Sequence, residues 1–264
     1  MSSRPLLDHD PHSHRWSDDA TGARLLRMRV VAYGATMNGM STTPPDIDGQ
    51  IKQSMVFGHL TIAFDERVLR PRPWTVAQSR WASELLPTGL GPARVLELCA
   101  GAGHIGLLAL AMADAHSDQH RLVAVDVNPT ACVYARRNAA AAGMGHRVDV
   151  REGGIDDALS PGERFDLVIA DPPWVARAET DRFPDDPLTA IDGGRDGLDV
   201  VRSCLRVCER HLLPGGSVVL QLGTEGQAHN VRDYLSSTAA TMLLLETRSF
   251  GARGVLVRLS AGAA

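Results

Sequence analysis

The sequence predicts an α/β fold, a doubly wound and mostly parallel seven-stranded sheet closed by a C-terminal antiparallel hairpin. Apolar strand-like runs alternate with helix-like runs between residues 94 and 237, and this alternation is typical of a parallel sheet. A glycine-rich turn joins the first of these strands to the first of the helices that follow it. Two apolar runs near the C-terminus are separated only by residues 251–254, which leaves no room for a helix and therefore predicts a hairpin.

The first residues of the chain do not follow this alternation. Residues 1–22 are polar and rich in His, Asp and Ser, which predicts a disordered tail. His9, His12 and His14 lie in this tail without Cys or acidic ligands at a suitable spacing, so we expect no metal site there.

Residues 23–73 are expected to form a small N-terminal segment. Its stretch 24–33 fits either a strand or a helix, while Gly and Pro mark residues 38–50 as a loop. Apolar and polar residues alternate over residues 54–69, and this alternation predicts a β-hairpin.

Residues 74–264 are expected to form the main domain. Thr75 can cap a first helix that runs to about Leu86. The apolar runs predict strands near residues 94–98, 122–126, 147–151, 165–170 and 217–222. The runs between and after them predict helices near residues 104–115, 129–142, 196–211 and 225–237, and the terminal hairpin pairs residues 242–250 with 254–259.

The glycine-rich turn has the features of a nucleotide-binding loop. Gly101 and Gly103 allow a tight turn and close approach of a ligand, and the helix that follows offers free N–H groups at its positive end. Asp126 ends the next strand, 23 residues after Gly103, which is about the separation expected for a carboxylate that binds ribose hydroxyls. The alternative interpretation of Asp126 is a helix N-cap or turn acid before Asn128-Pro129.

The fourth strand ends in a second motif, Asp171-Pro172-Pro173-Trp174. The prolines have fixed φ and no N–H, so they hold the turn rigid and leave its carbonyls free. A carboxylate and a free carbonyl can accept hydrogen bonds from a planar N–H group, while an aromatic face stacks on it. The motif therefore fits a site that holds an amide, amine or nucleobase nitrogen, although it also fits a plain turn.

The glycine pattern alone also fits an NAD-binding turn, but three features favour S-adenosylmethionine (SAM). Glu97 ends the first strand, where a carboxylate can face a cationic ligand that bears an amino acid. More than 90 residues precede the turn, whereas a dehydrogenase turn normally opens the chain. A hydride-transfer enzyme has no use for Asp171 and the prolines at the end of the fourth strand.

With these motifs the chain resembles the HemK/PrmC-type class I SAM-dependent methyltransferases, which methylate glutamine side-chain amides in proteins. The resemblance covers about residues 56–260. It rests on Val68-Leu69-Arg70-Pro71-Arg72-Pro73-Trp74-Thr75, Glu97-x-x-x-Gly101-x-Gly103, Asp126, Asp171-Pro172-Pro173-Trp174, Ala190-Ile191-Asp192-Gly193-Gly194-Arg195-Asp196-Gly197-Leu198-Asp199 and Leu213-Pro214-Gly215-Gly216. The resemblance implies that Thr75 lies in the wall of the SAM pocket.

The chain departs from the family at the acceptor motif, where Asp171 and Trp174 replace the usual Asn and Tyr, and at Trp74, which replaces a Glu. The family's Gly-Asp after the third strand, whose acid holds the adenine amine, is Gly153-Gly154 in this chain, and Asp156 or Asp157 is the candidate to replace that acid. These changes leave the SAM site broadly intact and concern the acceptor.

The expected activity is SAM-dependent transfer of a methyl group to a nitrogen of a protein or small-molecule acceptor. Asp171 and the Pro172 carbonyl are expected to accept the hydrogens of that nitrogen, with Trp174 as the stacking face. Asp171 can also take the released proton, which an Asn cannot. Two alternatives stay open: methylation of a nucleobase exocyclic amine, and a SAM-binding protein without catalytic activity.

Composition limits the partners. The 264 residues are 44% hydrophobic, which predicts one α/β core. Their net charge of −4 and pI of about 6.2 give no electrostatic footprint for nucleic acid and count against a nucleic-acid partner. Arg202, Arg206 and Arg210 recur on one helix and are expected to be solvated. No apolar run approaches 18 residues and no signal peptide is evident, which predicts no membrane association and a cytoplasmic location. The four cysteines show no metal spacing, and the sequence leaves the oligomeric state open.

Overall fold

The structure is a computed structural model of the chain, and it describes residues 53–87, 91–114, 118–238 and 241–262. The expected tail and the segment 24–33 lie outside the described residues, as do His9, His12 and His14. None of the helices in the described part of the chain is long and apolar enough to cross a membrane.

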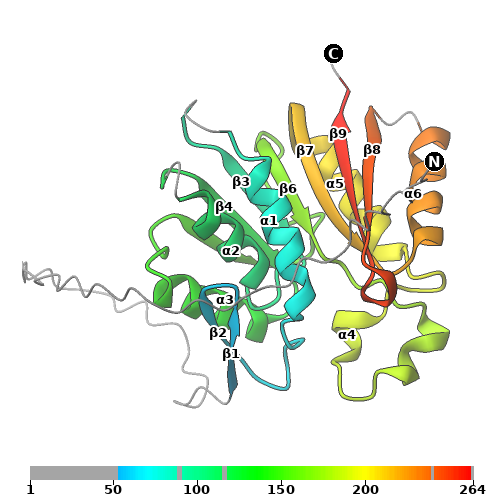
Figure 1. The fold of residues 1–264 in the computed structure, drawn as a ribbon. Helices are drawn as coiled ribbons and strands as arrows, with labels where there is room; N and C mark the ends of the chain where they lie inside the picture. The colour runs from blue at the N-terminus through cyan, green and yellow to red at the C-terminus, as the bar shows by residue number, and fades with distance from the viewer. Residues whose placement is uncertain (1–52, 88–90, 115–117, 239–240, 263–264) are drawn as a thin grey trace, which may run out of the picture. The chain divides into compact units, whose positions relative to one another are not determined.

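The centre of the fold is a seven-stranded sheet with the order β5-β4-β3-β6-β7-β9-β8 (Figure 1). Its strands are β3 (Arg94–Leu98), β4 (Arg121–Asp126), β5 (Val148–Glu152), β6 (Phe165–Ala170), β7 (Leu212–Leu222), β8 (Met242–Ser249) and β9 (Val255–Ala261). Neighbouring strands from β5 to β7 are parallel, whereas β9 lies antiparallel between β7 and β8. The predicted fold class and the terminal hairpin are therefore confirmed.

The order of the strands places a topological switch beside β3. The chain runs outward from β3 through β4 to β5 and then returns to the other side of β3 as β6. Ligands of open α/β sheets bind at the carboxyl ends of the strands where the order reverses. The two sequence motifs follow β3 and β6, so the fold brings both of them to this point.

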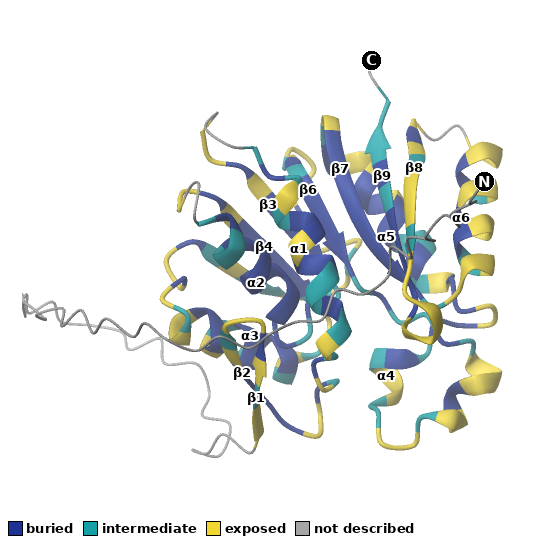
Figure 2. Cartoon of the chain, viewed as in Figure 1, coloured by how far each residue is buried: buried dark blue, intermediate teal, exposed yellow. Residues whose placement is uncertain are grey.

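Helices cover both faces of the sheet. α1 (Val76–Glu84), α2 (His104–Ala113) and α3 (Pro129–Ala141) share a buried cluster with one face, and α5 (Asp199–His211) and α6 (Glu225–Ser237) share a second cluster with the other. Alternate residues of each central strand belong to opposite clusters, as with Val95 and Leu96 of β3. Figure 2 shows β3, β6 and β7 buried between the helices, with exposed residues at the rim.

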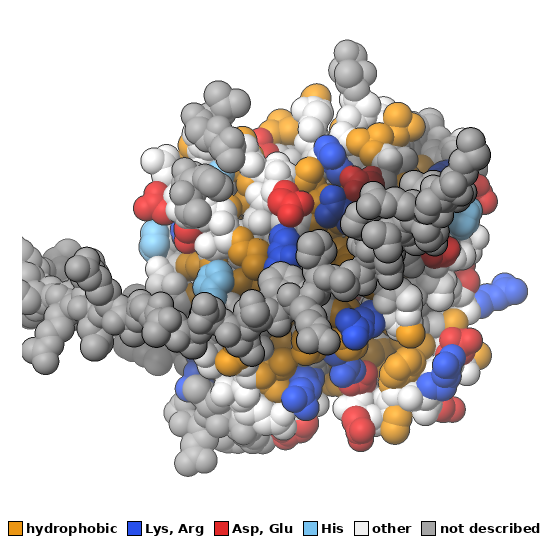
Figure 3. Space-filling model, in the orientation of Figure 1, with side chains coloured by type: hydrophobic (Ala, Val, Ile, Leu, Met, Phe, Trp, Pro, Cys, Tyr) orange, Lys and Arg blue, Asp and Glu red, His pale blue; other side chains and the backbone are white. Residues whose placement is uncertain are grey.

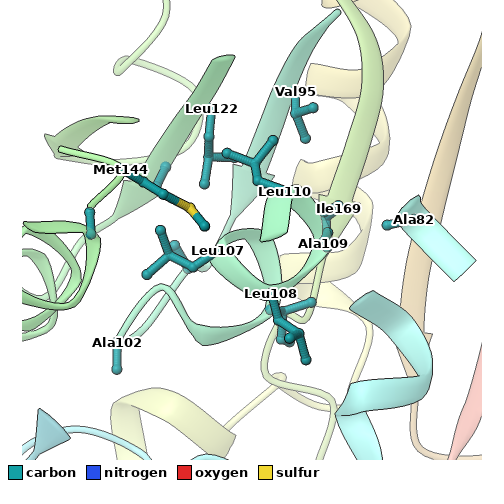
Figure 4. Close-up of a cluster of buried hydrophobic side chains, with 14 of the residues drawn as sticks. Ala82, Val95, Ala102, Leu107, Leu108, Ala109, Leu110, Leu122, Met144 and Ile169 are labelled. Carbon is teal, nitrogen blue, oxygen red and sulfur yellow. The ribbon is translucent and has the colours of Figure 1, made fainter. Parts of the chain in front are cut away.

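α2 is apolar around most of its circumference, as expected of a helix that is buried between other elements. Most of its residues are buried, including three leucines, Leu107, Leu108 and Leu110. Figure 4 shows these side chains directed toward different neighbours, among them Leu122 of β4 and Met144 after α3. The helix that leaves the glycine-rich turn is thus fixed on all sides.

Two expected elements differ in detail. The predicted cap of α1 is wrong, because the Thr75 hydroxyl donates to the Arg72 carbonyl (2.8 Å) and accepts no helix N–H. α5 begins at Asp199 rather than at 196, since Gly197 has a φ of 75° and interrupts helical geometry. The short helix α4 (Leu188–Ile191) was not expected.

The predicted N-terminal hairpin is confirmed, with β1 (Gln53–Phe57) antiparallel to β2 (Leu60–Phe64). Its buried side chains Phe57, Ile62 and Ala63 belong to the same cluster as α2 and α3. Asn138 of α3 fastens it there: Oδ1 accepts from Ala63 N–H (2.9 Å), and Nδ2 donates to the carbonyls of Ala63 (3.0 Å) and Ala102 (2.9 Å). The hairpin is therefore tied directly to the glycine-rich turn.

Replacing Asn138 by Ala should lower the free energy of unfolding by roughly 2–4 kcal/mol, since it leaves several buried backbone groups without partners. Chemical denaturation measures this change. Arg137→Ala, an exposed position on the same helix, is the control and should change stability by less than about 0.5 kcal/mol. Equal stabilities for the two variants would contradict the role given to Asn138.

Candidate active site

A cavity of about 470 Å³ lies at the carboxyl ends of the central strands. Its walls come from the residues after β2, the turn after β3, the end of β4, the loop after β5, the end of β6, and α4 with the start of α5. In the view of Figure 1, α4 lies below the sheet. The lining includes Val68, Leu69, Cys99, Gly101, His104, Ile105, Asp126, Val127, Asn128, Ala131, Gly154, Ile155, Asp156, Asp157, Asp171, Pro173, Thr189, Ala190, Asp199, Val200 and Ser203.

The turn after β3 has a left-handed backbone at three positions. Cys99 has a φ of 57°, Gly101 of 54° and Gly103 of 77°. For the glycines this conformation is free of steric cost, whereas for Cys99 it costs about 1–2 kcal/mol. The turn is nevertheless held in place, because Gly101 N–H donates to Asp126 Oδ2 (2.7 Å).

Asp126 lies where the sequence predicts a ribose-binding acid. Its Oδ1 accepts from Asn128 N–H (2.8 Å) and its Oδ2 from Gly101, so the carboxylate is oriented at the rim of the cavity. Burial raises the pKa of Asp126 above its ordinary value. Each oxygen retains acceptor capacity for a ligand hydroxyl.

Glu97 lies behind the cavity and does not line it. It is 2% exposed, and its Oε1 accepts from Gly106 N–H of α2 (3.0 Å). Its Oε2 has no partner among the residues that the structure describes and leaves no room for a Cβ at Gly106. Burial raises the pKa of Glu97 to about 8, with the charges of Asp126 and Asp171 adding to the effect. Glu97 therefore braces α2 against β3, and its direct contact with a ligand stays a prediction.

Asp171 lies at the end of β6 and lines the cavity, as does Pro173. No hydrogen bond to the Asp171 carboxylate occurs within the described ranges, and burial raises its pKa to about 7. Pro172 is buried and Trp174 does not line the cavity, because its indole packs on Gly223 after β7. The structure thus brings Asp171 alone of the expected acceptor side chains into the cavity wall.

The backbone of this motif is held by a second glycine-rich segment, residues 192–199. Gly193 N–H donates to the Val175 carbonyl (2.8 Å), and a Cβ at Gly193 would collide with the Pro173 carbonyl. Gln227 of α6 donates from Nε2 to the Trp174 carbonyl (2.8 Å) and accepts from Gly223 N–H (2.8 Å). Glycine is therefore needed at Gly193 because the backbone of the acceptor motif passes too close for a side chain. From the sequence alone, this run is identified only by its resemblance to the family.

The loop after β5 supplies the other end of the cavity. Asp156 and Asp157 both line it, together with Gly154. Asp156 Oδ1 accepts from Arg210 Nη2 (2.9 Å) of α5, so this side chain is already paired. Both candidates for the adenine amine line the cavity, and their contact with adenine stays a prediction.

Thr75 is separate from these residues. It is 3% exposed and does not line the cavity, whereas Val68 and Leu69 of the same motif do. Arg72 of this segment pairs with Asp186, which precedes α4. Of residues 68–75, only Val68 and Leu69 line the cavity.

The lining is acidic. It contains Asp126, Asp156, Asp157, Asp171 and Asp199, and no Lys or Arg is among the described lining residues. The sequence reasoning missed His104 and Cys99, for which only their position in the glycine-rich turn was a signal. Such a wall suits a cationic ligand. The ribose role of Asp126, the adenine role of Asp156 or Asp157 and the ligand contact of the glycine-rich turn stay predictions.

Glu97→Gln should flatten the pH dependence of stability. The folded pKa of about 8 exceeds the ordinary 4.5, so the folded state binds the proton more tightly and wild-type stability falls as pH rises between these values, by up to about 1.4 kcal/mol per pH unit. A neutral Gln removes that contribution. Denaturation from pH 5 to 9 measures both slopes, and equal slopes would show that Glu97 ionises normally.

Comparison with known proteins places the chain in a family. A model described as Methyltransferase small domain matches residues 80–184. The ribosomal protein uL3 glutamine methyltransferase of Burkholderia pseudomallei is 32% identical over 222 residues, which cover 77% of this chain and 68% of that protein. The corresponding protein of Bordetella pertussis is 34% identical over 61% of this chain and 54% of its own, so this chain spans about half of its length. The release factor glutamine methyltransferase of Mycolicibacterium smegmatis is 34% identical over 67% of this chain and 62% of its own.

Solved structures agree in fold. A methyltransferase from Pyrococcus furiosus has a TM-score of 0.56 at 18% identity and covers 78% of this chain and 90% of its own. The ribosomal protein L11 methylase of Lactobacillus delbrueckii subsp. bulgaricus has a TM-score of 0.55 at 14% identity, over 78% and 96% of the two chains. The sheet order, the glycine-rich turn and the relationship to the Burkholderia protein together show that the chain belongs to the HemK/PrmC-type class I SAM-dependent methyltransferases.

Proposed function

We propose that the protein transfers a methyl group from SAM to a side-chain nitrogen of a protein acceptor, with a glutamine amide as the first candidate. The observation that carries the proposal is the Asp171 carboxylate, which lines the cavity without a hydrogen-bond partner among the described residues. It lies at the end of β6, one strand away from the turn proposed to hold SAM. The printed names of the relatives, methyltransferases of ribosomal uL3 and release factor glutamines, support this acceptor class.

Bound SAM supplies a strongly electrophilic methyl group on its sulfonium. The residues of this chain contribute proximity, orientation and a place for the proton. In the proposal, Asp171 and the Pro172 carbonyl accept the hydrogens of the acceptor nitrogen and turn its lone pair toward the methyl. A pKa of about 7 lets Asp171 take up the proton that is released on transfer. Stacking of the acceptor on Trp174 stays a prediction.

Charge argues against a nucleic-acid acceptor. Arg202 of α5 pairs with Asp196, and Arg210 with Asp156, so these arginines are not a free basic stripe. On the face drawn in Figure 3, basic and acidic side chains are interspersed. The acidic cavity would also repel a nearby phosphate. A cytoplasmic location fits acceptors such as a ribosomal protein or a release factor.

The proposal is tested by incubating the purified protein with isotopically labelled SAM and purified uL3, release factor or a cell extract. Mass spectrometry then locates the methylated residue. Label on a protein nitrogen supports the proposal, and label on glutamine supports the amide. Label only on a metabolite or a nucleobase would overturn the protein acceptor. SAM binding without any transfer would favour the non-catalytic alternative.

Asp171→Ala should lower turnover by roughly 100-fold or more while the affinity for SAM stays near wild type, because Asp171 acts on the acceptor. Steady-state kinetics and calorimetry separate the two effects. Asp171→Asn is the matched variant. If Asp171 takes up the proton, the Asn variant is slow and its rate no longer rises through pH 7; if Asp171 only orients an amide, much of the rate is retained. A fully active Ala variant would remove Asp171 from the mechanism.

A further inference from the structure

His104 is a buried polar side chain that the proposed transfer does not use. It is the first residue of α2, it is among the residues that line the cavity, and it is 9% exposed. Neither ring nitrogen has a hydrogen-bond partner among the described residues, and Nδ1 is enclosed completely. A buried nitrogen without a partner costs about 1–3 kcal/mol, so its place at a ligand cavity calls for a physical reason.

The ring is held in one orientation and is uncharged. The Phe57 ring of β1 meets it edge to face, with centroids 4.8 Å apart and an interplanar angle of 86°. Burial lowers the pKa of His104 to about 4, so the imidazole is neutral at physiological pH. A neutral imidazole carries one N–H donor and one acceptor nitrogen.

The order of the strands shows which part of the cofactor lies beside His104. Along the carboxyl edge, β5 leads to Asp156, β4 ends in Asp126, β3 leads into the turn that contains His104, and β6 ends before Asp171. A SAM molecule with adenine near Asp156 and ribose on Asp126 therefore has its amino-acid part at the β3 turn, before the acceptor site. His104 is the polar side chain of the lining at that place.

The α-carboxylate of SAM needs hydrogen-bond donors, and few of the lining side chains carry an N–H group. No Lys or Arg is among the described lining residues. Asn128, the other nitrogen-bearing side chain of the lining, donates from Nδ2 to the Arg67 carbonyl (2.9 Å) and accepts at Oδ1 from Thr130 N–H (2.9 Å). His104 also lies at the N-terminus of α2, where the helix dipole favours a negative charge.

We propose that the His104 imidazole donates a hydrogen bond to the α-carboxylate of SAM and thereby distinguishes ligands that carry the amino-acid group from those that lack it. The inference rests on the proposed use of SAM. His104 would contribute little to the adenosine part, which has its own partners at Asp126 and in the loop after β5.

Calorimetry with two probes tests this assignment. S-adenosylhomocysteine carries the amino-acid group, whereas 5′-methylthioadenosine shares the adenosine and the thioether and lacks that group. His104→Phe keeps a ring against Phe57 and removes the donor, so it should weaken S-adenosylhomocysteine binding by about tenfold or more and methylthioadenosine binding by less than about twofold. His104→Gln retains an N–H donor and should recover part of the loss.

Equal weakening of both probes would show that His104 only shapes the cavity, and unchanged affinities would show that it has no role; either result overturns the inference. If the variants do not fold, NMR of the wild type tests the inference. The ¹⁵N resonances of the His104 imidazole should shift when S-adenosylhomocysteine binds and remain unchanged when methylthioadenosine binds. Identical shifts with the two probes would contradict the assignment. Failure of the wild type to bind S-adenosylhomocysteine would instead refute the proposed function together with the inference.

Discussion

The hydrogen bond from Gly101 N–H to the Asp126 carboxylate is the interaction on which the site depends. It joins the turn after β3 to the end of β4 and holds a backbone that is left-handed at Cys99, Gly101 and Gly103. A non-glycine residue persists in such a conformation only where its surroundings leave no alternative. Glu97 and Asn138 provide those surroundings from the two sides, by binding Gly106 N–H and the Ala102 carbonyl. Asn138 therefore connects the N-terminal hairpin to the glycine-rich turn by hydrogen bonds, and the Phe57 ring contacts His104 beside it.

A second constraint is the close approach of backbones on the acceptor side. The segment that contains Gly193 and Gly197 lies directly against the carbonyls of Pro173 and Trp174, and Gly223 lies under the Trp174 ring. A side chain at any of these glycines would push the acceptor motif out of place. Gln227 then donates a hydrogen bond to the Trp174 carbonyl, which holds this loop against α6.

Both the glycine-turn side and the acceptor side of the site contain buried carboxyl groups. Glu97, Asp126 and Asp171 are gathered at one end of the sheet, and burial raises the pKa of each of them. A nearby cationic ligand would lower these pKa values again, because an opposite charge favours the ionised carboxylates. The proposed binding of a sulfonium would offset part of the cost of burying these groups, and the proposed donor His104 is neutral.

The sequence by itself determined the strands, most of the helices and the positions of Asp126 and Asp171 at strand ends, because alternation of apolar residues and glycine-rich turns are local signals. It also predicted the terminal hairpin from the short connection alone. The tertiary structure alone decided where side chains point. Glu97 faces α2 rather than the cavity, Trp174 packs on Gly223, and Thr75 turns back to Arg72. The start of α5 and the exposure of His104 to the cavity were settled in the same way, because each depends on contacts between segments that are brought together only when the sheet and its helices pack.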